Sequence, residues 1–225
     1  MSMKLPLLLS VNAGYVDTAA FLALQGLFTA HVTGNFVTLA STLVLGGSGA
    51  TAKLLALPLF CLVVMLVRLG GSVLALHDLP ELRIILGIKV LLLAAAAALA
   101  LRCGPFADGD AAPALATGML LVAAMAIQNT INRQHLASTP PTTIMTGNTT
   151  QFMMDLADRL HGPPPDRRDA VRARFDRLGL SIIGFTLGCA AGALAYLWLR
   201  QICFVVPPVL ALAALAIRPA TPPVV

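Results

Sequence analysis

The chain has 225 residues, of which 58% are hydrophobic and 11% are charged. Soluble domains carry about 25% charged residues, so this chain has too few charges to cover a water-soluble globule, and lipid must solvate much of its surface. The net charge is +5, and six of the fifteen basic residues lie in residues 159–177. A basic segment between apolar segments is typical of a cytoplasmic loop and does not indicate nucleic-acid binding.

A helix that crosses a bilayer needs about 20 mostly apolar residues. The first predicted span resembles a signal peptide, but Asp17 interrupts its apolar run, and we interpret it as a retained helix. The last span holds Pro207 and Pro208 and is expected to be kinked or to begin late. The predicted spans are residues 5–24, 54–76, 82–101, 114–132, 178–199 and 202–217.

Two further segments, residues 28–47 and 138–160, begin with polar and glycine residues and continue as short helices. If both cross the membrane, eight helices form two parallel repeats. If both re-enter, six helices form two inverted repeats. We favour eight, because residues 28–47 are uncharged and long enough to cross.

The distribution of basic residues does not separate these two models. Lys53 and Arg102 are cytoplasmic in the eight-helix model, whereas Arg83 and Arg133 replace them on that side in the six-helix model. Both models place the two termini and the basic segment in the cytoplasm.

The two ambiguous segments are related in sequence, with a period of about 113 residues: Thr29-x-x-x-Thr33-Gly34-Asn35 recurs as Thr142-x-x-x-Thr146-Gly147-Asn148. In the preceding helices, Asp17 falls opposite Asn129 with a shift of one residue. The sequence therefore predicts an all-α, polytopic bundle of two transmembrane repeats, residues 1–112 and 113–225. This is the scale of the repeats found in transporters.

A carboxylate in the middle of a membrane helix is costly and normally faces a partner or a water-filled cavity. Asp17 is therefore predicted either to handle a cation or proton, or to hold the structure together by hydrogen bonds. Its expected neighbours are Thr33, Asn35 and Asn129. Arg68 is a candidate counter-charge for Asp17, although snorkelling to the membrane surface is the favoured interpretation for this residue.

The Thr-Gly-Asn segments are the second candidate site, because two broken helices whose polar ends meet can form a solute site near the midplane. The alternative is helix capping and close packing without a ligand. His31 is expected to be a hydrogen-bonded neighbour of the first motif, and Lys89 is expected to snorkel. The candidate substrate-binding residues are Asp17, Thr33, Gly34, Asn35, Gln128, Asn129, Thr146, Gly147 and Asn148.

Gly184, Gly188 and Gly192 recur at every fourth residue, which is typical of close helix packing, either within the chain or in a homodimer. The four cysteines are interpreted as small apolar residues and not as disulfide or metal ligands. The sequence has no catalytic motif, so no enzyme activity, metal or cofactor is predicted.

Several stretches together make the chain resemble the YoaK-type family of bacterial membrane proteins: Gly14-Tyr15-Val16-Asp17, Gly26-Leu27-Phe28-Thr29, Thr33-Gly34-Asn35-Phe36, Gln128-Asn129 and Met145-Thr146-Gly147-Asn148. The resemblance covers nearly the whole chain. It implies a bacterial inner-membrane protein and transfers no substrate or catalytic residue.

The function expected from these features is that of a transporter or channel for a small, unidentified solute. The alternative is a non-transporting scaffold or a lipid-interacting partner protein, and a lipid-modifying enzyme is less expected. The expected partners are the lipid bilayer, the small solute and a second copy of the chain, without nucleic acid.

Overall fold

A computed structural model describes residues 3–162 and 166–217, and within these ranges it is helical and contains no strand. The residues outside these ranges include 218–225, the end of the predicted second repeat. The elements are α1 (Lys4–Ala23), η1 (Val32–Gly34), α2 (Asn35–Leu45), α3 (Ala50–Leu76), α4 (Glu81–Cys103), α5 (Ala112–His135), α6 (Met145–His161), α7 (Arg168–Leu199), η2 (Arg200–Val205) and α8 (Val206–Ala216).

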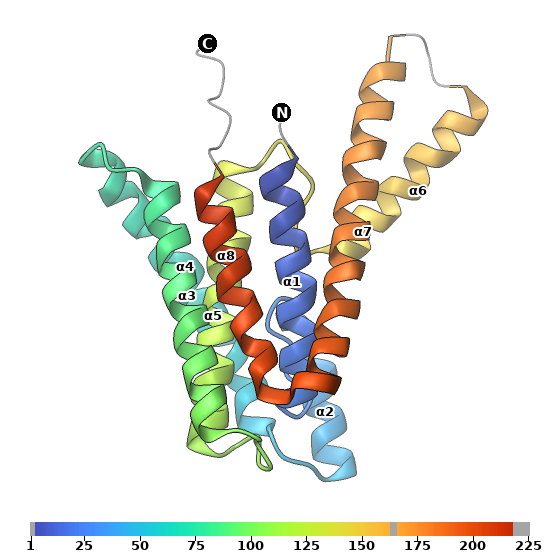
Figure 1. The fold of residues 1–225 in the computed structure, drawn as a ribbon. Helices are drawn as coiled ribbons and strands as arrows, with labels where there is room; N and C mark the ends of the chain where they lie inside the picture. The colour runs from blue at the N-terminus through green and yellow to red at the C-terminus, as the bar shows by residue number, and fades with distance from the viewer. Residues whose placement is uncertain (1–2, 163–165, 218–225) are drawn as a thin grey trace.

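Five helical stretches of the described residues are long and apolar enough to cross a membrane. The last stretch, Arg168–Ala216, holds both α7 and α8, because the chain reverses direction at η2 (Figure 1). Arg200 has a φ of 49° at this reversal. Each predicted span therefore coincides with α1, α3, α4, α5, α7 or the η2–α8 unit, as expected for a multi-pass membrane protein.

The last predicted span does begin late. α8 starts at Val206, after the six residues of η2, and prolines occupy its first turn. A proline is tolerated at the start of a helix because the N–H that it lacks would have no partner within the helix.

The eight-helix arrangement favoured from the sequence is not confirmed. α2 has 11 residues, about half of what a crossing needs, and α6 is not among the apolar spans. The linker after α1 turns back along that helix, because the Thr29 N–H reaches the Asp17 carboxylate at 2.7 Å. α6 likewise begins within the depth of the bundle and leans outward toward the end at which α7 starts (Figure 1). Neither segment forms a single helix long and apolar enough to cross.

The two ends of the bundle are defined by the start of α1 and the end of α8, and by a set of linker contacts. The start of α1 and the end of α8 lie at the same end (Figure 1). The end of α1, the start of α3 and the α4–α5 linker meet at the other end, through hydrogen bonds from Gln25 Nε2 to Phe106 O and from Gly49 N to Asp110 Oδ2. Lys53, near the start of α3, and Arg102, near the end of α4, therefore lie opposite the N-terminus, which differs from the eight-helix prediction.

The predicted glycine ridge packs α7 against α1 within one chain. A Cβ atom on Gly188 would collide with the Val11 carbonyl, and one on Gly192 would lie 2.7 Å from the Tyr15 carbonyl. Gly14 of α1 contributes in return, since a Cβ there would collide with the Phe185 carbonyl. This close packing fixes α7 beside the stretch of α1 that carries Asp17.

Candidate functional site

The Asp17 carboxylate holds the returning linker to α1. Its side chain is 4% exposed. One oxygen accepts hydrogen bonds from the N–H groups of Thr29 and Ala30, each at 2.7 Å, and from the Thr29 hydroxyl at 3.2 Å. The other oxygen lies 2.7 Å from His31 Nδ1. The cost of burying the carboxylate is thus offset by four polar contacts with one short segment.

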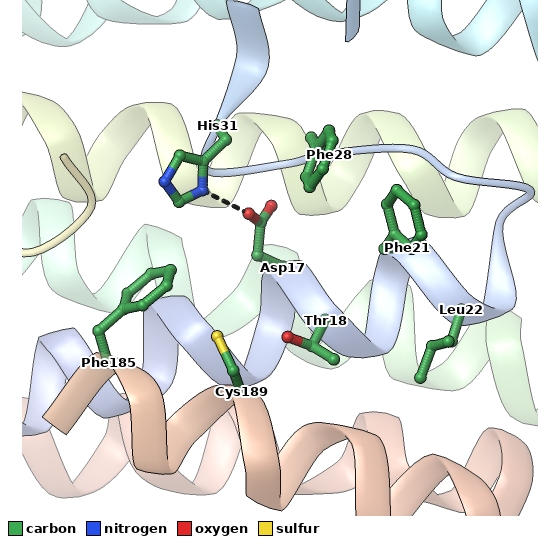
Figure 2. A pocket seen from close by; sticks show the side chains of 8 residues that line it. All are labelled: Asp17, Thr18, Phe21, Leu22, Phe28, His31, Phe185 and Cys189. Carbon is green, nitrogen blue, oxygen red and sulfur yellow. Dashed lines mark hydrogen bonds and ion pairs between the residues drawn. The ribbon is translucent and has the colours of Figure 1, made fainter. Parts of the chain in front are cut away.

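A cavity of about 250 Å³ lies beside the Asp17–His31 pair, between α1, the linker and α7 (Figure 2). Aromatic rings form much of its wall, and the His31 ring lies edge-on to Phe185 with centroids 5.4 Å apart. His31 uses Nδ1 for Asp17, so its Nε2 is the ring nitrogen that remains for a ligand (Figure 2). The lining residues are Asp17, Thr18, Phe21, Leu22, Phe28, His31, Phe185 and Cys189.

The second Thr-Gly-Asn segment is hydrogen-bonded to amide side chains of α5, whereas the first segment is hydrogen-bonded to the Asp17 carboxylate of α1. Thr142 N–H donates to Asn132 Oδ1 at 2.6 Å, and the Thr143 hydroxyl donates to Asn129 Oδ1 at 2.7 Å. Gln128 Nε2 donates to the Thr142 hydroxyl at 3.0 Å. Three neutral side chains on α5 therefore do what the Asp17 carboxylate does on α1.

The asparagines of the two motifs make the same hydrogen bond. Asn35 Nδ2 donates to the Phe28 carbonyl, and Asn148 Nδ2 donates to the Pro141 carbonyl, in each case across seven residues and at 2.7 Å. The Phe28 N–H also donates to Asn35 Oδ1 at 2.9 Å, which Pro141 cannot match because proline lacks an N–H. The shared bond is what a duplication of the segment predicts.

A second cavity, of about 180 Å³, lies beside the second segment, and its lining residues are Asn129, Asn132, Arg133, Ala137, Thr139, Pro141 and Ile144. With the offset of about 112–113 residues seen in the sequence, four residues of the first cavity correspond to four of the second: Asp17 to Asn129, Phe21 to Arg133, Phe28 to Pro141 and His31 to Ile144. The two cavities have no lining residue in common. None of the threonines, glycines and asparagines of the two motifs lines either cavity, so neither cavity is the single midplane site expected where the polar ends of the motifs meet.

Some of the predicted site residues lie away from these contacts. Thr33 and Thr146 are exposed, and their hydroxyls make no hydrogen bond within the described part of the chain. A Cβ atom on Gly34 would lie 3.0 Å from the Phe28 ring, so this glycine permits close packing, whereas a Cβ on Gly147 would meet nothing nearer than 4.0 Å.

The neighbours expected for Asp17 were wrong. Its hydrogen-bond partners are Thr29, Ala30 and His31. Among the described residues, Thr33, Asn35 and Asn129 make no hydrogen bond with it, and Asn35 pairs with Phe28 instead. Arg68, the candidate counter-charge, is exposed on α3, and the ion-pair partner of Asp17 among the described residues is His31.

Lys89 does not snorkel as expected. It is fully buried on α4 and donates to Gln128 Oε1. The Gln128 amide also donates to the Leu9 carbonyl of α1, at 2.9 Å. Gln128 thus links α1, α4, α5 and the second Thr-Gly-Asn segment in one buried polar network. Asn12, in the next turn of α1 after Leu9, is also buried, and both of its amide atoms have no partner among the described residues.

Comparisons with known proteins identify the family but not an activity. No curated protein and no solved structure matches the chain. The YoaK-type resemblance is not confirmed by these comparisons. A family model matches residues 5–217, and the chain therefore belongs to the family described as "protein of unknown function (DUF1275)".

Proposed function

We propose that this protein carries a small solute across a bacterial inner membrane, as a transporter or channel, and that the first cavity is part of the solute path. The observation that carries the proposal is the Asp17–His31 pair, which faces a cavity of about 250 Å³ between helices of the bundle. Polar and ionisable groups inside a membrane are costly, and they commonly mark the paths of solutes, ions or protons. No catalytic residue is proposed.

The arrangement of the two repeats supports the same function. α1 and α5 run in opposite directions, and each is followed by a linker and a short helix (Figure 1), which we propose to be a re-entrant segment. Asp17 lies six residues before the end of α1 and Asn129 six residues before the end of α5. The two sites therefore lie at comparable depths from opposite ends of the bundle. Inverted repeats with broken helices around the solute site are a common architecture of secondary transporters.

In the proposed orientation, both termini are cytoplasmic. With the re-entrant arrangement, Arg83, Arg133 and the basic residues of α6 and α7 lie at the end that holds the termini, while Lys53, Arg102 and Arg200 lie at the other. Cytoplasmic ends collect an excess of Lys and Arg. The first cavity would then lie nearer the periplasmic face and the second nearer the cytoplasmic face.

A scaffold or lipid-interacting protein remains the second candidate, because one observation favours it. The Asp17 carboxylate is fully engaged with Thr29, Ala30 and His31, as a structural residue would be. A scaffold needs these hydrogen bonds between the linker and α1, but it does not need water to reach the first cavity. Water access to the cavity therefore separates the two candidates.

Cys189 provides the test, because this native cysteine lines the first cavity. In a chain in which the other cysteines are replaced by alanine, a small, charged, water-soluble thiol reagent should modify Cys189 in reconstituted membranes. Cys61 is the matched control, because it is exposed on α3 among apolar side chains that would face lipid. A chain with Cys61 as its single cysteine should react slowly. If Cys189 reacts no faster than Cys61, the cavity is not a water-filled path.

A further inference from the structure

The second cavity has a different chemistry from the first. The carboxylate and the imidazole that face the first cavity correspond to Asn129 and Ile144 here, and Phe21 corresponds to Arg133, an exposed residue that contributes to the lining. The lining residues include no carboxylate. The site has thus lost its acidic group and gained a permanent positive charge, so its ligand must differ from that of the first cavity.

The hydrogen-bonding groups around the cavity fit an anion. Asn132 and Thr139 are each 6% exposed and line the wall. Thr139 uses its hydroxyl and its N–H for the Leu136 carbonyl, so it shapes the wall and is not counted as a donor. Asn132 uses its Oδ1 for Thr142 N–H, so the group that it retains for a ligand is the donor Nδ2. The Asn129 Nδ2 already donates to the Met125 carbonyl, so Asn132 supplies the one amide donor. An arginine fork and an amide donor in a small cavity suit the oxygens of a phosphate group.

The start of α6 adds to the same preference. Ile144 lines the cavity and is also the N-cap residue of α6, whose first turn is not capped by any side chain. The unsatisfied N–H groups and the positive end of the helix dipole at such a terminus stabilise a bound anion. Arg177 of α7 is close by, donating to the Ser138 carbonyl at 3.5 Å.

We infer that the cavity lined by Arg133, Asn132 and Thr139 binds a phosphate group, presented either by a free phosphate compound or by the headgroup of an acidic lipid. Arg133 supplies the charge and a two-pronged donor, while Asn132 and the start of α6 supply neutral donors. This site lies near the end of α5, at the end of the bundle that holds the start of α1 and the end of α8 (Figure 1). It does not depend on solute passage through the first cavity.

The test measures ligand-dependent thermal stability of the full chain, purified in a maltoside detergent that contains no phosphate. Inorganic phosphate and phosphatidylglycerol are added separately, with chloride and a phosphate-free neutral lipid as references. Saturable stabilisation by inorganic phosphate indicates a free phosphate compound as the ligand. Stabilisation by phosphatidylglycerol alone indicates a lipid headgroup. Stabilisation by neither overturns the inference.

Arg133→Gln should weaken binding of the effective ligand by about tenfold, the loss expected when one charge-assisted hydrogen-bonding group is removed. Arg133→Lys, which keeps the charge but not the fork, should lie between the wild type and Arg133→Gln. Arg83→Gln is the matched control, because it removes the same charge at the same end of the bundle but outside the cavity. Equal weakening in Arg83→Gln and Arg133→Gln would mean general attraction to the basic surface and would overturn the site.

Discussion

At the residue scale, Asp17 is the side chain on which the first site depends. Its carboxylate accepts from two backbone N–H groups that are buried with it. Asp17→Leu removes the acceptor and should lower the folded yield strongly, because each buried donor left without a partner costs about 1–3 kcal/mol. Asp17→Asn retains one acceptor oxygen and should fold to nearly the wild-type yield. Size-exclusion chromatography of detergent-solubilised protein measures both.

The same pair of variants separates the two roles of Asp17. If its charge serves solute or proton handling, Asp17→Asn should fold and yet lose transport or its dependence on pH. If the residue is structural, Asp17→Asn should keep both. A normal yield of folded Asp17→Leu would contradict either role, since it would show that the linker needs no acceptor on α1.

The contact of Asp17 and Asn129 with the two Thr-Gly-Asn segments could be predicted from the sequence, but most of their partners could not. A lone carboxylate in an apolar run and a repeated motif can both be recognised in the sequence without a structure. Which face of a helix a side chain occupies depends on how neighbouring helices pack. For that reason Lys89 was expected at the membrane surface but is fully buried, and Asn132 was not identified at all.

At the scale of elements, the backbones of α1 and α7 approach each other so closely that only glycine fits at the contact positions of α7. Gly188→Ala places a methyl group against the Val11 carbonyl, with which it would collide. Because a backbone carbonyl cannot move aside easily, the substitution should lower the free energy of unfolding by about 1–3 kcal/mol or more, as is typical of overpacking. Thermal unfolding in detergent measures the loss.

Gly70→Ala in α3 is the control for this substitution, because a Cβ atom there meets nothing within 4 Å. Alanine also favours a helix over glycine by up to about 1 kcal/mol, so Gly70→Ala should be neutral or slightly stabilising. Equal stability of Gly188→Ala and Gly70→Ala would show that α7 does not pack on α1 as described.

The α6–α7 pair carries a second prediction at this scale. Asp155 of α6 has a fully buried side chain and accepts from Arg174 Nη2 at 2.6 Å and Nε at 2.8 Å. The Arg174 hydrogen bonds lower the pKa of Asp155 below its usual value, against the opposing effect of burial. The carboxylate therefore stabilises the helix pair fully above about pH 4, the ordinary value for an unfolded aspartate. This contribution is lost as the pH falls through the lower, folded pKa.

Limited proteolysis at acidic pH can follow this loss, with an acid-active protease that cleaves α6 or α7 when they separate. Cleavage of the wild type should increase as the pH falls below about 4. Asp155→Asn should be more sensitive at neutral pH and should show little further change on acidification. A wild type and an Asp155→Asn variant with the same pH profile would rule out this contribution.

The positions of the long apolar helices could be predicted, because a run of about 20 apolar residues is visible in the sequence. The helices that follow the predicted segments are α1, α3, α4, α5, α7 and α8. The path of the two Thr-Gly-Asn segments was not predictable. Residues 28–47 are uncharged and long enough to cross. The first part of this stretch is not helical, however, because it runs back along α1 and donates hydrogen bonds to the Asp17 carboxylate. That leaves α2 with 11 residues.

At the scale of the whole molecule, the proposed re-entrant arrangement would determine which loops share a side of the membrane. Cys103 is exposed at the end of α4, at the end of the bundle opposite the N-terminus. With cytoplasmic termini, a membrane-impermeant thiol reagent should label Cys103 in intact cells. The eight-helix model predicts no labelling, so the experiment distinguishes the two arrangements directly.

Asp158→Cys, in a chain without the native cysteines, is the control for sidedness. Asp158 is exposed on α6, which leans toward the end that holds the termini. This cysteine should react after the membrane is permeabilised and not before. Protection of Cys103 in intact cells together with labelling of Asp158→Cys would reverse the proposed orientation.

The release of solutes from proteoliposomes tests solute passage most directly, because many candidate solutes are followed at once and no single substrate has to be chosen. Vesicles are loaded with a mixed extract of small metabolites, and mass spectrometry follows what leaves them. At least one class of solute should leave wild-type vesicles faster than protein-free vesicles. His31→Ala at the first cavity should slow this release, while His161→Ala on the exposed end of α6 should not. Equal retention of every detected solute by wild-type and protein-free vesicles would contradict a transport function.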